Sequence, residues 1–470
     1  MKIIPQIAVK MVEKVTESLR TTGINSIGQA INELVPIVNE TVLEILKAVI
    51  EETDEILLRG TKKLRKEDGI RIKEKNIERT VLTDIGELKF RRTYFKTEDG
   101  YVYLTDQVIG IESYERITKE LVAKILEAAG EVSYEKAAET TGQKVTRQTV
   151  HNRLRALKEV VTEVSKKETP KEIDIFADED HVNIRGGKNA IVPLITITEG
   201  IDTSNEKRHK TKEPLHIAAY GMEAEALREN VLAVLCERYD LEKAEKINVH
   251  GDGAGWINNL SKALPKANLI IDGYHFEKEL RSFLSLKRAS GYEKRIREAF
   301  LKEDGYDDFE ECIMKIRDRQ ETEKDIEKVD KFVSYCINRW EAIALRLNKD
   351  VCGSCTEPLV SHILSKRLSR DPLTWSKEGL KKMTMLLVYQ KNGGRLSADD
   401  VRITPSTKDA HDFKKNGYLK YRDYAAKQAD EMLKQNYDWS LFDKELNTFG
   451  MVDYVYLIRT SLGSPRSLVC

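Results

Sequence analysis

Apolar and polar residues follow three successive patterns along the chain. Residues 1–60 carry apolar side chains every three or four positions, which predicts helices. From Glu78 to Thr105 β-branched and aromatic residues dominate, and Asp99-Gly100 marks a turn, so we expect a small antiparallel sheet. Residues 114–169 return to helical spacing. The clearest stripe in the first region comprises Ile31, Leu34, Ile37, Val38, Val42, Leu43, Ile45 and Leu46.

From about residue 171 strand-like and helix-like segments alternate. The order of predicted elements is three strands, a helix, a strand, a helix and a strand, which indicates an α/β domain with a mixed sheet. We expect strands at 171–185, 190–200, 214–220, 246–250 and 268–272, and helices at 222–239 and 253–264. Residues 276–344 are highly charged and helical, which indicates a helical insertion, and a further helix starts at Pro358.

These transitions divide the chain into seven expected segments. They are an N-terminal helical region (1–74), a small antiparallel β unit (75–110), a helix-turn-helix region (111–170), the first part of an α/β core (171–275), the helical insertion (276–350), the last part of the core (351–395) and a C-terminal region (396–470).

Composition narrows the class of protein. The 470 residues include 78 basic and 78 acidic side chains, a net charge of zero, which excludes a uniformly basic coat for nucleic acid but not a locally basic surface. Charges interrupt every long apolar stretch, so we expect no membrane span. The N-terminus lacks the features of a signal peptide, and the six cysteines show no framework spacing. Both observations favour a reducing cytoplasm.

The region around Gly142 fits a helix-turn-helix. Val150, Leu154 and Leu157 would give the second helix an apolar seat, and another face would be free to reach base edges or phosphates. Between Gly142 and Lys158 there are five basic residues and no acid. The alternative is an ordinary pair of surface helices. The candidate DNA contacts are Lys144, Arg147, Gln148, Asn152 and Arg155.

A second basic block follows Ser361, and its candidate phosphate contacts are Lys366, Arg367 and Arg370 on a predicted helix. A solvated helix face is the alternative. The nearby Cys352-Gly-Ser-Cys355 motif has no second cysteine pair, so a packed loop is favoured over a zinc site or a redox pair.

Three separated carboxylates form the main chemical hypothesis. Asp178 lies in or at the end of the first strand of the α/β core, Asp252 follows a later strand, and Glu357 begins a helix. Ligand sites collect at such strand ends, and carboxylate oxygens suit Mg²⁺. Each acid has a structural alternative, since Asp252 could belong to a turn and Glu357 could favour a helix N-terminus. Glu179 and Asp180 compete with Asp178 for the role of ligand.

Several longer segments together resemble a known family. They are GELKFRRTYF with YVYLTDQVIGI, ADEDHVNIR, HGDGAGWI, IDGYHFEK, and TEPLVSHILSKRLSRDPLTWSKEG followed by NGG. On these segments the chain resembles bacterial DDE transposases of insertion sequences, of the ISLre type, which are similar to Mutator-like transposases. The resemblance covers most of the chain.

The resemblance implies an α/β fold with an RNase H-like mixed-sheet catalytic domain. It assigns the metal-binding acids to Asp178, Asp252 and Glu357, which would hold Mg²⁺ or Mn²⁺, with two ions expected. It places His275 of the Asp272-Gly-Tyr-His275 segment near the scissile phosphate; a histidine merely satisfied by Asp272 is the alternative. Pro358 departs from the pattern, in which a small residue is expected after the third acid. Proline pushes the residue before it out of the helical region, so Glu357 would lie at the mouth of the helix, from where it could still reach a metal. Glu341 is therefore the fallback for the third acid.

The expected activity is that of a DNA transposase. It would bind the terminal inverted repeats of its element, hydrolyse the phosphodiester at each end and join the 3′-hydroxyls to target DNA. Its partner would be double-stranded DNA, and cutting two ends implies a homodimer or larger assembly on DNA. A metal-dependent nuclease without strand transfer and a non-catalytic DNA-binding regulator remain as alternatives. A glycosidase using paired carboxylates would explain neither the helix-turn-helix nor the basic block.

Overall fold

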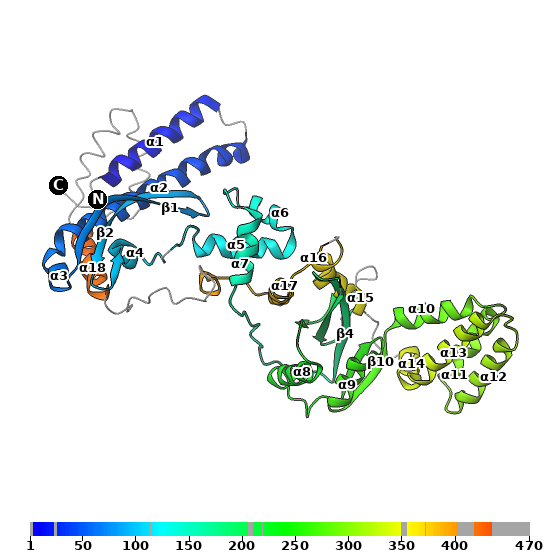
Figure 1. The fold of residues 1–470 in the computed structure, drawn as a ribbon. Helices are drawn as coiled ribbons and strands as arrows, with labels where there is room; N and C mark the ends of the chain where they lie inside the picture. The colour runs from blue at the N-terminus through cyan, green and yellow to red at the C-terminus, as the bar shows by residue number, and fades with distance from the viewer. Residues whose placement is uncertain are drawn as a thin grey trace, which may run out of the picture. The chain divides into compact units, whose positions relative to one another are not determined.

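The computed structural model describes residues 3–22, 26–112, 114–187, 189–204, 210–218, 220–348, 355–371, 373–402 and 418–434 (Figure 1). The chain divides into two compact units. The first combines residues 1–125, 137–147 and 397–470, and the second combines 126–136 and 148–396. Among the described helices, none is both long enough and apolar enough to cross a bilayer.

The first unit joins long helices to a small antiparallel sheet, as expected. Its helices are α1 (Ile3–Thr22), α2 (Ile27–Gly60), α3 (Lys62–Glu67), α4 (Leu104–Ile109) and α18 (Leu419–Lys434). Its strands, in sheet order, are β1 (Arg71–Thr83), β2 (Gly86–Thr97) and β3 (Gly100–Val102). The turn at Asp99-Gly100 is confirmed. The last strand is shorter than expected, because α4 already begins at Leu104, which is fully buried.

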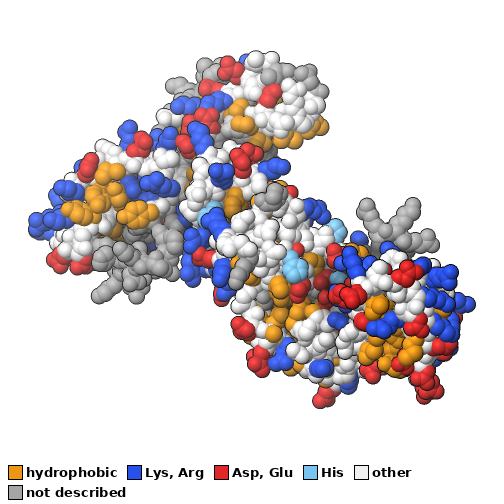
Figure 2. All heavy atoms as spheres, turned by 45° about the vertical axis from the view of Figure 1, so that its right-hand side comes forward, with side chains coloured by type: hydrophobic (Ala, Val, Ile, Leu, Met, Phe, Trp, Pro, Cys, Tyr) orange, Lys and Arg blue, Asp and Glu red, His pale blue; other side chains and the backbone are white. Residues whose placement is uncertain are grey.

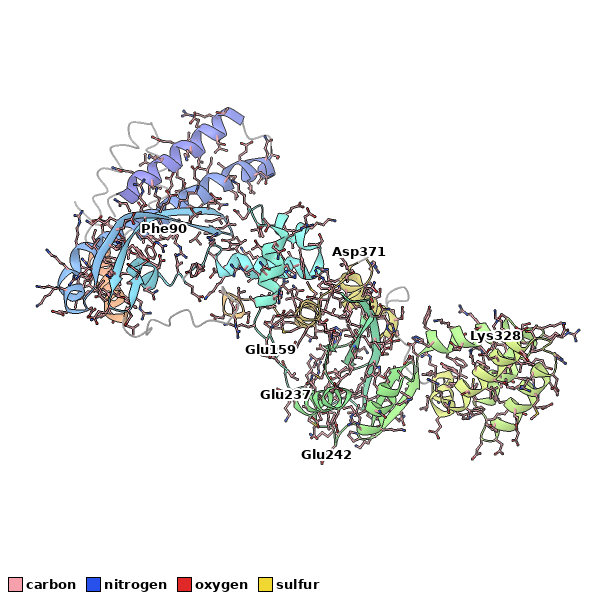
Figure 3. The ribbon with its side chains drawn as sticks, in the orientation of Figure 1. Phe90, Glu159, Glu237, Glu242, Lys328 and Asp371 are labelled. Atoms are coloured by element: carbon pink, nitrogen blue, oxygen red, sulfur yellow. The ribbon has the colours of Figure 1, made fainter. Side chains whose placement is uncertain are left out.

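Helix α2 packs against β2 through apolar and polar contacts. Phe90, labelled in Figure 3, lies in a buried cluster with Ile50 of α2. One turn further, the buried carboxylate of Asp54 accepts hydrogen bonds from Thr93 N (2.8 Å), Thr93 Oγ1 (2.6 Å) and Thr105 Oγ1 (2.5 Å). This carboxylate therefore connects α2 to both the sheet and α4.

Three helices follow the first sheet in the chain: α5 (Lys119–Glu131), α6 (Tyr134–Glu139) and α7 (Arg147–Ala156). Gly142 lies between α6 and α7 with φ +64°, a conformation that glycine adopts at little cost. Val150, Leu154 and Leu157 are buried, which confirms the apolar seat predicted for α7. The division into units runs through these helices.

The second unit is built on a mixed five-stranded sheet. Its strands are β4 (Glu172–Asn183), β5 (Asn189–Thr198), β8 (Leu215–Ala218), β9 (Lys246–Gly251) and β10 (Ala267–Ile271). The order across the sheet is β10-β9-β4-β5-β8. Strands β4, β5 and β8 are antiparallel neighbours, whereas β9 and β10 run parallel to β4. The predicted sequence of strands and helices is confirmed; a small hairpin of β6 (Ile201–Asp202) and β7 (Lys210–Thr211) was not expected.

The two faces of this sheet differ. Helices α8 (Ala224–Arg238) and α9 (Gly255–Ala263) cover one face with an aliphatic core. The other face carries buried polar pairs: His250 Nε2 lies 2.9 Å from Asp174 Oδ1, and His216 Nδ1 lies 2.9 Å from Thr196 Oγ1. The alternation of β4 puts Asp174 and Asp178 on this second face.

The predicted helical insertion is confirmed. It forms a helical lobe beside β10, in which Figure 3 labels Lys328 (Figures 1 and 3). Its helices are α10 (Gly273–Leu284), α11 (Glu293–Ala299), α12 (Gly305–Arg317), α13 (Glu323–Ile337) and α14 (Trp340–Leu347). The chain then returns through α15 (Thr356–Val360), the π-helical turn η2 (Ser361–Ser365), α16 (Lys366–Leu368) and α17 (Lys377–Lys391).

Candidate active site

Strand register brings two of the predicted acids together. Parallel pairing of β4 and β9 sets Phe176 opposite His250, so Asp178 lies level with Asp252 two residues further along. Pairing of β9 and β10 sets Ile271 opposite Gly251, so Asp272 lies level with Asp252 in turn. Three aspartates from neighbouring strands therefore share one level at the carboxyl ends of β9 and β10.

The loop that carries Asp252 is tightly fixed. Asp252 Oδ1 accepts a hydrogen bond from Ala254 N (2.7 Å), and Gly253 has φ +79°. Arg339, at the start of α14, donates from Nε to the backbone oxygen of Asp252 and from Nη2 to that of Gly253, both at 3.2 Å. A side chain at position 253 would collide with Arg339. The insertion thus holds the backbone of the second acid.

The third acid is brought to the sheet by its neighbour in sequence. Thr356 is buried, and its hydroxyl donates a hydrogen bond to Asp272 Oδ2. Glu357 follows it and is exposed. We expected Pro358 to keep Glu357 out of the helix, but α15 begins at Thr356 and includes Glu357 in its first turn. Pro358 is accommodated there because first-turn N–H groups have no acceptor within the helix.

The pKa of Asp178 responds to the charges of the other two predicted acids. Burial raises the pKa of Asp178 to about 6, and the charges of Asp252 and Glu357 raise it as well. The Glu179 N–H, which donates to Asp178 Oδ1 at 2.8 Å, and His275 lower it. Asp178 is 8% exposed, so its charge is held in a desolvated position next to other negative charges.

His275 lies on the first turn of α10, close to the same acids. Asp272 caps this helix, accepting hydrogen bonds from Tyr274 N (2.7 Å) and His275 N (3.3 Å). His275 Nδ1 lies 3.4 Å from Asp272 Oδ1, an ion-pair distance without hydrogen-bond alignment. Asp272, together with the charges of Asp178 and Asp252, raises the pKa of His275. Figure 2 shows acidic side chains beside histidines on one face of this unit.

The competing acids are engaged elsewhere. Asp180 accepts hydrogen bonds from Ser369 Oγ at 2.9 and 3.0 Å, and Glu179 Oε2 accepts one from Trp256 Nε1 at 2.8 Å. The pKa of Asp180 is also raised by burial. Both side chains therefore have structural partners, which leaves Asp178 as the acid of β4 best suited to a ligand.

The ligand atoms that this site offers are carboxylate oxygens, which are the kind that hard divalent cations prefer. A buried carboxylate beside two further carboxylates is stabilised by a bound positive charge, and oxygen ligands suit Mg²⁺ or Mn²⁺. Among the described residues, no three His, Cys, Asp or Glu side chains stand close enough to hold an ion as they are. The acids are electrostatic neighbours, and coordination would require their side chains to converge.

The candidate DNA-binding residues of α7 and the preceding turn are exposed. Gln148 Nε2 donates to Asn152 Oδ1 at 2.9 Å, which places the two on one helix face. Arg155 is half-exposed and pairs with Glu378 of α17 (Nε to Oε2, 2.8 Å). Lys144 and Arg147, just before and at the start of α7, are exposed.

The second basic group is only partly on the surface. Lys366 and Arg370 are exposed, and Lys366 pairs with Glu131 at 3.2 Å. Arg367, in contrast, is 8% exposed, donates from Nε to Ala129 O (2.8 Å) and lies over the rings of Tyr134 and Trp375. The structure therefore places Arg367 in the interior of the second unit rather than on a DNA-facing surface.

Cys352 lies outside the described residues, so the Cys352/Cys355 pair is described at one end only. Cys355 is the residue that precedes α15, and its backbone oxygen accepts from Leu359 N at 3.1 Å. This contact joins the backbone of Cys355 to the first turn of α15.

Three residues near the site were not identified from the sequence. Thr356 and Arg339 position Glu357 and Asp252 through the contacts described above. Tyr274 is 56% exposed, and its ring meets the ring of His275 edge to face, with 5.5 Å between the centroids. The IDGYHFEK segment contained the signal for Tyr274; the partners of Thr356 and Arg339 lie too far along the chain for any local pattern.

Comparison with known proteins identifies one family. A family model described as uncharacterised protein family UPF0236 matches residues 20–403. A UPF0236 protein of Caldanaerobacter subterraneus subsp. tengcongensis, whose name combines eleven gene designations, is 35% identical over 388 residues, covering 81% of each chain. Another from that strain, with four designations, is 34% identical over 411 residues, covering 84% of each chain.

A more distant relative comes from another organism. The UPF0236 protein in the vanSb 3′ region of Streptococcus gallolyticus is 25% identical over 328 residues, covering 66% of this chain and 71% of that protein. The family model spans most of the present chain, including all of the candidate acids. The chain therefore belongs to the UPF0236 family.

Proposed function

We propose that this protein is a DNA transposase that acts on the ends of its own mobile element. The observation that carries the proposal is the placement of Asp178, Asp252 and Glu357 as electrostatic neighbours at one edge of the sheet. Register sets the two aspartates level, and Glu357 is close enough to raise the pKa of Asp178. Metal-dependent phosphoryl transfer requires such a group of carboxylates on a rigid scaffold.

The topology of the sheet supports an RNase H-like reading of this scaffold. Three antiparallel strands in chain order (β4, β5, β8) are followed by two strands (β9, β10) that add in parallel on the other side of β4. The first acid comes from the central strand and the second from the end of its parallel neighbour. The insertion α10–α14 then separates the second acid from the third.

The proposed chemistry assigns a role to each side chain. Asp178, Asp252 and Glu357 would hold Mg²⁺ or Mn²⁺, which when bound neutralises charge on the phosphate and lowers the pKa of a water molecule. His275, whose Nδ1 lies 3.4 Å from Asp272 Oδ1, can present its other ring nitrogen to a phosphate oxygen. Arg339 and Thr356 keep the backbone of the acids in place. Gln148, Asn152, Arg155, Lys366 and Arg370 would contact DNA, with Lys144 and Arg147 beside them.

Two further observations fit a mobile element. The names of the relatives combine eleven and four gene designations within one strain, and multiple copies in a genome are typical of transposable elements. Exposed basic side chains on α7 and α16 are suited to the phosphate backbone. The proposed action on DNA in the bacterial cytoplasm is consistent with both.

The proposal is tested with supercoiled plasmid DNA that carries the native flanks of the gene. Protein and Mg²⁺ are added and the products are mapped to the nucleotide. Cuts at fixed flanking positions with 3′-hydroxyl ends, followed by joined products, are expected. Asp252→Asn should abolish cutting while retaining binding, and Glu341→Gln serves as the matched control that keeps activity.

The outcomes separate the candidate functions. Metal-dependent cutting without joined products would identify a nuclease. Binding of the flanks without any cutting would contradict an active transposase and favour a DNA-binding regulator. Loss of activity in Glu341→Gln but not in Glu357→Gln would reassign the third acid.

A further inference from the structure

Helix α2 carries an apolar surface that the described part of the chain leaves exposed. Seven large apolar side chains along this 34-residue helix are 36–77% exposed. They are Ile27 (77%), Ile31 (53%), Val35 (47%), Val38 (38%), Val42 (39%), Leu46 (41%) and Val49 (36%). We call this set the α2 stripe. Monomeric proteins rarely expose a continuous apolar strip of this length.

The α2 stripe lies on one side of the helix. At 3.6 residues per turn its members fall within an arc of about 100°. No Lys, Arg, Asp or Glu between Ile27 and Thr53 falls in that arc, although the chain as a whole is 33% charged. The charged residues gather on other sides, where Glu40 pairs with Lys14 of α1 at 2.7 Å and Glu33 accepts from Ser18 at 3.5 Å. On most surface helices the exposed side carries the charged and polar residues, and the apolar side faces the core.

The other sides of α2 are occupied by the chain itself. Helix α1 packs along one side, and β2 and α4 pack along another through Ile50, Asp54 and Leu57. The stripe therefore does not serve the core of the first unit. Its persistence over six turns indicates a partner of matching length.

The spacing within the stripe indicates what this partner is. Val35, Val42 and Val49 recur every seven residues, as do Ile31, Val38 and the half-buried Ile45, with steps of three and four between the two series. This is the heptad repeat of a coiled-coil seam, with β-branched residues at all six positions. Such a seam is complementary to an identical seam, so a second copy of this chain satisfies it with no other protein.

The area is sufficient for a specific contact. The exposed parts of the stripe amount to roughly 500 Å² per copy, compared with about 800 Å² that each partner contributes to a standard interface. Two copies would therefore bury about 1,000 Å² in total, which is at the lower limit for a specific interface. We propose that two copies of this chain associate through the α2 stripe, helix against helix, independently of DNA and metal.

The test uses the full-length chain without DNA or Mg²⁺. Sedimentation analysis across micromolar concentrations is expected to give twice the monomer mass. Val42→Glu places a charge in the centre of the stripe and should weaken association at least 10-fold. Lys47→Glu places the same side chain at an exposed position outside the stripe and should leave the dimer intact. Circular dichroism melting establishes that both variants are folded.

Either of two results would overturn the proposal. A monomeric parent at all concentrations would mean that the stripe is covered by another part of the same chain or by a different protein. A dimer that persists in Val42→Glu would mean that the copies associate through a different surface. Because the assay contains no DNA, neither result bears on the proposed transposase activity.

Discussion

Asp54 of the first unit and Asp178 of the second are equally hidden from water, but their carboxylates have different surroundings. They are 7% and 8% exposed. Asp54 accepts three hydrogen bonds from two threonines, which satisfies it within the fold. Among the described residues, Asp178 accepts one hydrogen bond, from Glu179 N, and lies near the negative charges of Asp252 and Glu357. Burial alone therefore does not identify a functional acid. The number of hydrogen-bond donors around the carboxylate distinguishes the two cases.

The comparison predicts opposite effects of the same substitution. Asp178→Ala should reduce metal-dependent DNA cleavage by more than about 100-fold, since changes to outer partners of a metal ligand already cost 10–100-fold. Its free energy of unfolding should change by less than about 1 kcal/mol, because a desolvated charge is removed together with its single bond.

Asp54→Ala should do the reverse. It leaves three donors unpaired in the interior, so the free energy of unfolding should fall by about 3 kcal/mol or more. Cleavage measured well below the melting temperature should be retained. Urea unfolding and plasmid cleavage of the two variants side by side check both predictions. Equal destabilisation by the two substitutions would show that Asp178 is a structural acid like Asp54.

A buried histidine in the second unit gives the next largest expected effect. Burial lowers the pKa of His216 to about 4, below the value near 6.5 of an unfolded chain. As the pH falls from about 6.5 toward 4, the imidazole of His216 binds a proton in the unfolded chain but stays neutral in the folded chain. The contribution of neutral His216 to the free energy of unfolding is therefore fully present above pH 6.5. It is lost on acidification, by on the order of 3 kcal/mol in total.

His216→Gln should flatten this pH dependence. Urea unfolding at pH 7.5, 5.5 and 4.5 would measure it, with the exposed His181→Gln as the matched control. A pH dependence in His216→Gln as steep as that of the parent would assign the acid sensitivity to other groups.

The threonine hydroxyls beside Asp54 stabilise the core of the first unit, whereas the hydroxyl of Thr356 bonds to Asp272 in the candidate site. Thr356→Val keeps the shape but removes the donor, and cleavage should fall by about 10-fold or more. Thr356→Ser should recover most of the activity. Equal cleavage by the parent and Thr356→Val would mean that Glu357 is held without this bond. Single-turnover rates at saturating Mg²⁺ provide the measurement.

The smallest effect is expected at the ion pair of Arg155 and Glu378. Both side chains are half-exposed, so breaking the pair should change stability by less than about 1 kcal/mol. If Arg155 contacts DNA, Glu378→Gln should tighten binding a few-fold. Arg155→Gln should weaken it and reduce the slope of log K against log salt by about one. An unchanged slope would remove Arg155 from the interface.

The fold of the second unit was predictable because its signals are local. Alternating apolar residues in β4 and β5, and turns such as Gly251-Asp252-Gly253, mark strands and their ends without reference to distant residues. Asp178 and Asp252 are level because β4 and β9 pair from their first residues, Glu172 and Lys246, and each acid lies six positions further along. The family resemblance supplied the role of His275.

The remaining features depend on contacts between distant segments. Arg367 follows Lys366 directly and shares its basic character, yet it lies about 100° further around the helix, where Ala129, Tyr134 and Trp375 enclose it. The start of α15 at Thr356 reflects a bond to Asp272, 84 residues earlier. No periodicity in one segment contains that information.

The two hydrogen bonds from Arg339 have a consequence for any attempt to simplify this protein. The residue that fixes the backbone of Asp252 lies 87 positions later, after four helices of the insertion. Removing α10–α14 and joining β10 directly to α15 would leave Asp252 without the guanidinium that restrains its backbone. The helical lobe therefore restrains the loop that carries Asp252, and a shortened protein would need another group to hold this loop in place.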